Sequence, residues 1–80
     1  MRNLQSPRQS RNRPHLTRRQ KECLRLLADG KTTAAIALEI GITIRTVRFH
    51  LRNIKLQLDA QSLLQAVAIA VKMGLLDDED

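Results

Sequence analysis

The sequence is poor in the residues on which membrane anchors depend. Its 80 residues include one Phe and neither Trp nor Tyr. A basic protein can bind a membrane surface, but helices that do so usually anchor themselves with aromatic side chains. No apolar run approaches the roughly 20 residues of a membrane-spanning helix, and no signal-peptide core follows Met1. We therefore expect a cytoplasmic protein.

The sequence is equally poor in the residues of catalytic and metal sites. A single cysteine, Cys23, excludes an intrachain disulfide and a zinc site. It sits among apolar positions at helical spacing, so we expect it in the core. No glycine-rich loop could cradle a phosphate, and no nucleophile has a base beside it. We expect no enzyme activity, no cofactor and no metal.

What the sequence has in excess is positive charge. It contains 14 Lys and Arg against 8 Asp and Glu, which gives a net charge of +6. Four of those acids form the run 77–80, so residues 1–76 carry 14 cations against 4 acids, a balance of +10. So large an excess on one small domain is typical of a protein with a polyanionic partner.

The composition divides the chain into three regions. Residues 1–15 contain four Arg and two Pro with almost nothing to bury, and we expect a basic arm or linker that is disordered when free. Residues 16–76 have the apolar periodicity of one folded domain. Residues 77–80 form an acidic tail.

Four segments of the domain combine helical periodicity with start and stop signals. The first begins at a capping box, in which Gln20 follows Thr17 by three residues, and ends at Gly30. The second is capped by Thr32 or Thr33 and ends at Gly41. The third is capped by Thr43 and the fourth by Ser62. The expected fold is all-α, with four helices of about 12, 8, 15 and 12 residues.

The third segment, to about Leu58, has two contrasting sides. At about 100° per residue, one side is an apolar stripe formed by Val47, Leu51, Ile54 and Leu58, with Ile44 on its edge. The other side carries Arg45, Arg48, Phe49 and Arg52. Only Gly41-Ile42-Thr43 separates this helix from the one before it, which is typical of a helix-turn-helix.

The fourth segment, from Ser62 to about Met73, is apolar on almost every side. Only Gln65 and Lys72 make a polar edge. Such a helix has more apolar surface than one small core can cover. We expect the surplus to form a dimer face, made of Leu64, Val67, Ala68 and Val71. The alternative is that all of it is core.

Two long motifs carry a resemblance to a known family. The stretch 16–24 reads L-T-x-R-x-x-E-x-L, and the stretch 41–54 reads G-I-T-x-x-T-V-x-F-H-L-x-N-I. Together with G-L-L at 74–76, they resemble the DNA-binding domain of LuxR-type (GerE-like) transcription regulators, over residues 16–76. The F-H-L-x-N-I run is closest to the acyl-homoserine-lactone quorum-sensing receptors. The resemblance implies either the C-terminal domain of such a receptor or a single-domain relative.

The resemblance also implies how such a domain works. The third helix enters the DNA major groove, and the fourth contributes to a dimer. Three residues on the basic side are then expected to contact bases: Arg48, Phe49 and Arg52. The alternatives are solvated arginines, and a Phe49 ring that folds back over the second helix.

Several other side chains are candidates for the DNA backbone. Free N–H groups at a helix start attract phosphate, and Arg45 lies near that start. The expected phosphate contacts are Lys31, Thr32, Thr43, Arg45, Thr46, Asn53 and Lys55. Thr43 could instead serve as a cap alone, and His50, on the border of the buried stripe, is expected to be structural.

The expected partners are double-stranded DNA with an inverted-repeat operator, a second copy of the chain bound weakly through the fourth helix, and RNA polymerase. We expect the protein at the bacterial nucleoid. The arm is interpreted either as idle linker or as a segment that reaches a minor groove. The rival function is a helical interaction module that binds another regulator or RNA polymerase.

Overall fold

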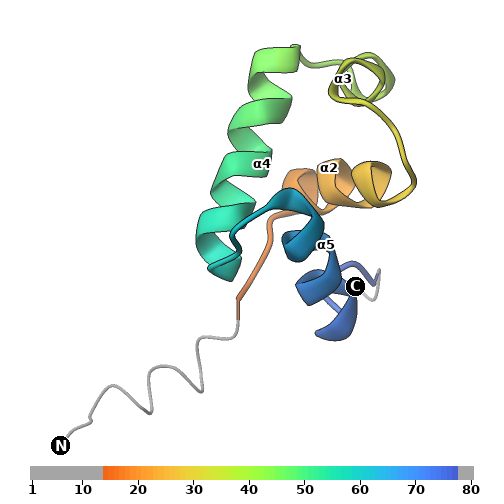
Figure 1. The fold of residues 1–80 in the computed structure, drawn as a ribbon. Helices are drawn as coiled ribbons and strands as arrows, with labels where there is room; N and C mark the ends of the chain where they lie inside the picture. The colour runs from red at the N-terminus through yellow and green to blue at the C-terminus, as the bar shows by residue number, and fades with distance from the viewer. Residues whose placement is uncertain (1–13, 78–80) are drawn as a thin grey trace, which may run out of the picture.

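The structure is a computed structural model that describes residues 14–77. It contains α2 (Arg18–Ala28), α3 (Thr33–Ile40), α4 (Ile44–Leu58) and α5 (Leu63–Lys72), and no described residue lies in a strand (Figure 1). The all-α prediction and its four helices are confirmed. Residues 1–13 of the expected arm and 78–80 of the expected acidic tail lie outside the described residues. None of the four helices is long and apolar enough to cross a membrane.

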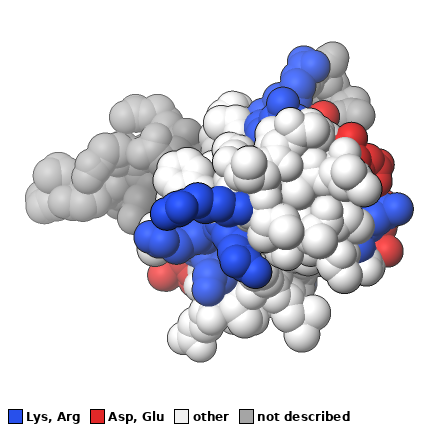
Figure 2. Space-filling view, turned by 90° about the horizontal axis from the view of Figure 1, so that it is seen from above, with Lys and Arg blue, Asp and Glu red and all other residues white. Residues whose placement is uncertain are grey.

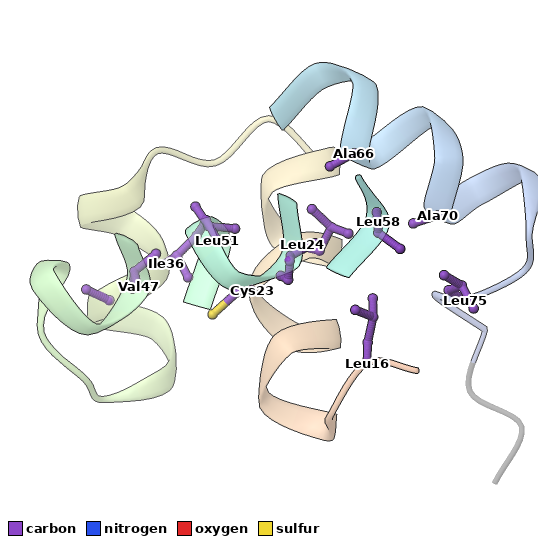
Figure 3. Packing of buried hydrophobic residues seen from close by; sticks show 12 residues of the cluster. Leu16, Cys23, Leu24, Ile36, Val47, Leu51, Leu58, Ala66, Ala70 and Leu75 are labelled. Atoms are coloured by element: carbon purple, nitrogen blue, oxygen red, sulfur yellow. The ribbon is translucent and has the colours of Figure 1, made fainter. Parts of the chain in front are cut away.

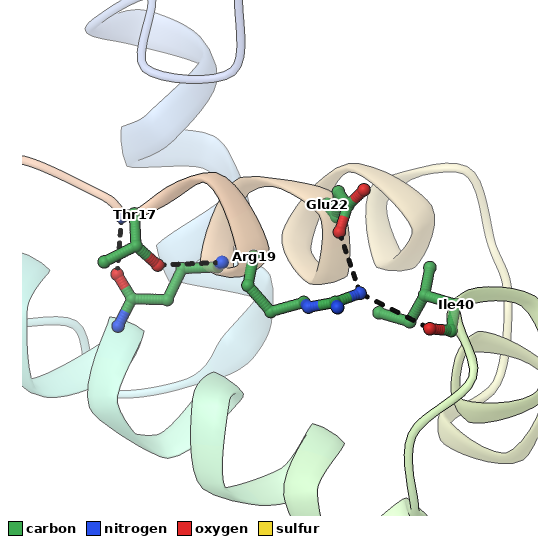
Figure 4. A network of polar contacts seen from close by, with 5 residues as sticks. Thr17, Arg19, Glu22 and Ile40 are labelled. Atoms are coloured by element: carbon green, nitrogen blue, oxygen red, sulfur yellow. Dashed lines mark hydrogen bonds and ion pairs between the residues drawn. The ribbon is translucent and has the colours of Figure 1, made fainter.

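Each helix begins at a hydroxyl side chain that caps it. Thr17 Oγ1 accepts a hydrogen bond from the Gln20 N–H at 3.1 Å, and Gln20 Oε1 accepts one from the Thr17 N–H at 2.9 Å (Figure 4). The capping box predicted from the sequence is therefore present. The caps of the other three helices are Thr32, Thr43 and Ser62. A cap of this kind stabilises a helix by about 0.5–2 kcal/mol relative to alanine.

The core lies where all four helices meet. α4 packs against α2, α3 and α5, and Figure 1 shows it running along one side of the other three. The core is formed by Leu16, Cys23, Leu24, Ile36, Ala37, Val47, Leu51, Ile54, Leu58, Ala66, Ala70 and Leu75 (Figure 3). The stripe predicted for α4 is buried in full, while Ile44 at its edge is partly exposed.

Cys23 is a core residue, as predicted. It is fully buried, and this burial raises the pKa of its thiol by desolvating the thiolate. Because the thiolate is the reactive form, Cys23 is placed to pack rather than to react.

The turn between α3 and α4 depends on glycine. Gly41 has φ of 73°, in the left-handed region, and its N–H bonds to the Ala37 carbonyl. The Ile42 N–H bonds to the same carbonyl at 3.0 Å. A Cβ on Gly41 would meet no atom within 4 Å, so the requirement is conformational rather than steric. Two residues later Thr43 caps α4, and this closes the helix-turn-helix.

Candidate nucleic-acid interface

The outer face of α4 carries three exposed arginines, Arg45, Arg48 and Arg52. They lie opposite the buried stripe, as the helical periodicity predicted. Among residues 14–77 no acid pairs with any of the three. Seen from above, Lys and Arg side chains gather on the side of the molecule where α4 lies, while Asp and Glu lie mainly on the other side (Figure 2). The outer face of α4 is therefore an uncompensated cationic surface.

Two apolar side chains share this cationic face. Phe49 is 58% exposed, and its ring is tilted by 60° against the His50 ring, with 5.8 Å between centroids. A ring folded back over α3 would be covered, so this exposure disfavours that alternative. Leu56 is 72% exposed and follows Phe49 by seven residues, on the same face. Leu56 was not predicted as a member of this face, although the same count of 100° per residue places it there.

The start of α4 adds backbone donors to the arginines. Thr43 Oγ1 accepts a hydrogen bond from the Thr46 N–H at 3.0 Å and lies 2.9 Å from Thr46 Oγ1. The cap leaves the N–H groups of Ile44 and Arg45 without an intrahelical partner, as at any helix start. These donors and the helix dipole favour an anion at this point.

The start of α3 has a similar cap and a partly neutralised cation. Thr32 Oγ1 accepts a hydrogen bond from the Ala35 N–H at 3.1 Å. Lys31 Nζ lies 3.7 Å from Glu39 Oε1, and both side chains are about half exposed. This ion pair was not predicted from the sequence. Glu39 lies in the last turn of α3, whereas Lys31 precedes the first turn.

Asn53 and Lys55 lie on the two flanks of α4. Both are partly buried, and helical periodicity puts them on opposite sides of the outer face. Lys55 borders the Arg48 side and Asn53 the Phe49 side. A contact from either residue would therefore reach a different side of whatever α4 binds.

Arg19 links the helix-turn-helix to α2, a contact that was not predicted from the sequence. Arg19 Nη1 donates to Glu22 Oε1 at 3.1 Å and to the Ile40 carbonyl at 3.4 Å (Figure 4). Ile40 is the last residue of α3, where carbonyls lack helical partners and a cation is favourable. Arg19 therefore joins α2 to the end of α3, just before the turn that leads into α4.

The outer face of α5 is apolar and uncovered. Leu64 is 81% exposed and Val71 is 62% exposed. Ala68 is exposed and Val67 partly buried. The core takes Ala66 and Ala70 instead, so the alternative that all of α5 is core does not hold. Within the described chain, no group of three or more potential ligand residues is placed to hold a metal.

The sequence of this domain matches the model of a known protein family. Residues 14–70 match GerE, the model of bacterial regulatory proteins of the luxR family. The chain therefore belongs to the luxR family. Its four helices are that family's helix-turn-helix DNA-binding domain, and the family consists of transcription regulators rather than enzymes.

Individual luxR-family proteins show the same relationship. The chain is 50% identical over 62 residues to the transcriptional activator protein AnoR of Acinetobacter nosocomialis. This alignment covers 78% of this chain and 26% of AnoR. The chain is 37% identical over 73 residues to the quorum-sensing regulator RhlR of Pseudomonas aeruginosa, or 91% of this chain and 30% of RhlR. The chain thus spans between a quarter and a third of the length of these relatives.

A solved structure of the transcription factor GerE confirms the fold. It superposes with a TM-score of 0.74 at 31% identity, and the match covers 78% of this chain and 96% of GerE. The resemblance noted from the motifs is therefore confirmed.

Proposed function

We propose that the chain binds double-stranded DNA sequence-specifically by inserting α4 into the major groove, and that it regulates transcription in this way. The observation that carries the proposal is the outer face of α4, where three exposed arginines have no acidic partner among residues 14–77. A helix of this size fits the major groove, which displays a distinct pattern of donors and acceptors for each base pair.

Within this proposal, Arg48 and Arg52 contact bases. They are one turn apart in the middle of the exposed face of α4. An arginine can donate two hydrogen bonds to O6 and N7 of guanine, which discriminates against other bases by about 1–3 kcal/mol. Phe49, exposed on the same face, would contact a thymine methyl group.

The phosphate contacts follow from position. Arg45, Thr43 and Thr46 surround the start of α4, where unpaired N–H groups favour phosphate. Lys31 and Thr32 present a second helix start, and Asn53 and Lys55 flank the outer face. These contacts would fix the orientation of the domain without carrying sequence information.

We further propose that the outer face of α5 forms a weak two-fold dimer on DNA. Leu64 and Val71 are the exposed large apolar residues of this face, and Val67 and Ala68 complete it. One short helix per subunit falls below the roughly 800 Å² per partner of a stable interface, so the dimer would form mainly on DNA. Its operator would be an inverted repeat with half-sites about one helical turn apart. RNA polymerase would be a further partner of the bound dimer.

Selection of bound sequences from a random DNA pool tests the function, followed by affinity measurements over a range of salt concentrations. The proposal predicts an enriched motif and a steep fall of affinity with salt, because neutralised phosphates release counterions. An interaction module that uses DNA only incidentally would show salt dependence but no enriched motif. That result would reject sequence-specific binding.

A further inference from the structure

The side of α3 that faces away from the core carries a large apolar residue. Leu38 is 86% exposed, the highest value among the large apolar residues of the described chain. Ala34, one turn earlier, is also exposed, whereas Ile36 and Ala37 are buried in the core. No described residue covers Leu38, and DNA binding by the arginines of α4 does not use it. Ala34 and Leu38 together form the outer face of α3.

One charge of each sign stands at the edge of this face, each at the unfavourable end of the helix. Lys31 precedes α3, and Glu39 lies in its last turn. The helix dipole favours an acid at the start of a helix and a base at its end, so both charges of α3 are reversed. Lys31 Nζ and Glu39 Oε1 lie 3.7 Å apart, but both side chains stay about half exposed. Each charge is therefore open to a second partner of opposite sign.

The outer face of α3 is complementary to a second copy of itself. The eight residues of α3 extend about 12 Å. Two such helices can lie antiparallel about a two-fold axis that passes midway between Ala34 and Leu38. The large Leu38 of one copy then lies over the small Ala34 of the other. The same arrangement brings Glu39 of one copy to the start of α3 in the other, beside its Lys31, so that both charges meet favourable helix ends.

We propose that the outer face of α3 binds the same face of a second copy of the chain, with the two helices antiparallel. The contact leaves the outer face of α5 free, because α3 and α5 lie on opposite sides of α2 (Figure 1). One face of so short a helix buries much less than the roughly 800 Å² per partner of a stable interface. The contact therefore forms where copies are already concentrated. On DNA it would join one α5-linked pair to a pair on the neighbouring operator, and this role rests on the proposed function.

The contact itself is tested without DNA, by amide spectra of the whole chain at increasing protein concentration. Samples extend to about 1 mM, the effective concentration that linkage on one DNA would supply. The signals of Ala34, Ala35 and Leu38 should move as the concentration rises, and Leu38→Ala should abolish this movement. Leu64→Asp, the matched control on α5, should leave it in place. Signals of α3 that stay constant, or that move equally in Leu38→Ala, would overturn the proposal in favour of a different protein partner.

Two charge variants test the antiparallel arrangement. Lys31→Glu makes both edge charges negative and Glu39→Lys makes both positive, so neither variant alone should show the concentration-dependent movement. An equal mixture of the two should restore it. General attraction cannot cause this recovery, because the parent chain carries +6 and each substitution changes the charge by two, so that both variants remain positive. A mixture that behaves like either variant alone would reject the arrangement. Because no DNA is present, none of these results depends on the DNA-binding function.

Discussion

The outer faces of α4 and α5 differ in chemistry, because the first is cationic and the second is apolar. Each helix buries one side in a shared core, α4 through residues such as Ile54 and α5 through Ala66 and Ala70. Outward, α4 shows arginines around Phe49, whereas α5 shows Leu64 and its apolar neighbours. Folding constrains only the inward side of a helix. The contrast between the outward sides therefore points to two different partners, a polyanion for α4 and an apolar surface for α5.

The largest effect on stability should come from a substitution in the core that α4 and α5 share. Ile54 is fully buried, and Ile54→Ala should lower the free energy of unfolding by about 2–5 kcal/mol through lost burial and a cavity. Denaturant titration measures this loss. The matched control is Arg48→Ala on the opposite side of α4, which should stay within about 0.5 kcal/mol of the parent. Equal losses would mean that the outward side also maintains the fold.

The next largest effect should come from substitutions on the cationic outer face of α4. Arg48→Ala should lower affinity for the selected DNA motif by about 1–3 kcal/mol and relax the preference at one position of each half-site. Arg45→Ala, with the same charge change nearer the helix start, should weaken binding while leaving the motif unchanged. A competition assay against single-base variants of the motif separates the two. If both variants relax the motif alike, the division between base and phosphate contacts is wrong.

The sequence predicted what is local in this fold, including the caps, the turn at Gly41 and the buried stripe of α4. These features depend on residues within a turn or two of one another, where periodicity and capping rules apply. The contacts it missed join distant residues: Arg19 with Ile40, Arg25 with Leu76, and Lys31 with Glu39. They arise from how the helices pack, and no spacing in the sequence signals them.

A further effect should come from substitutions on the apolar outer face of α5. Leu64→Asp and Val71→Asp place a charge on its exposed face, and each should leave the domain folded but abolish cooperative occupancy of two half-sites. Ala66→Asp is the matched control on the buried side, where an unpaired charge should unfold the domain. Circular dichroism and binding to one-site and two-site duplexes provide the readouts. Unfolding of the Leu64 and Val71 variants would instead assign these residues to the core.

The smallest effect concerns the ion pair at the start of α3. Lys31→Ala should weaken binding to all sequences about equally and flatten the salt slope by about one unit. Glu39→Gln frees Lys31 from an exposed pair worth about 0–1 kcal/mol, so it should strengthen binding slightly. That gain should vanish in the Lys31→Ala background. A gain that persists there would show that Glu39 acts through general repulsion of DNA instead.

The most direct test of whether α4, and not α5, contacts DNA is an amide-shift titration of the chain. The titrant is a duplex that carries one selected half-site. Binding through α4 predicts that the largest shifts fall between Thr43 and Arg52 and that the outer face of α5 stays unmoved. A duplex with both half-sites should add shifts at Leu64 and Val71. Shifts concentrated on α5 or on α2 with one half-site, and none along the outer face of α4, would contradict the account.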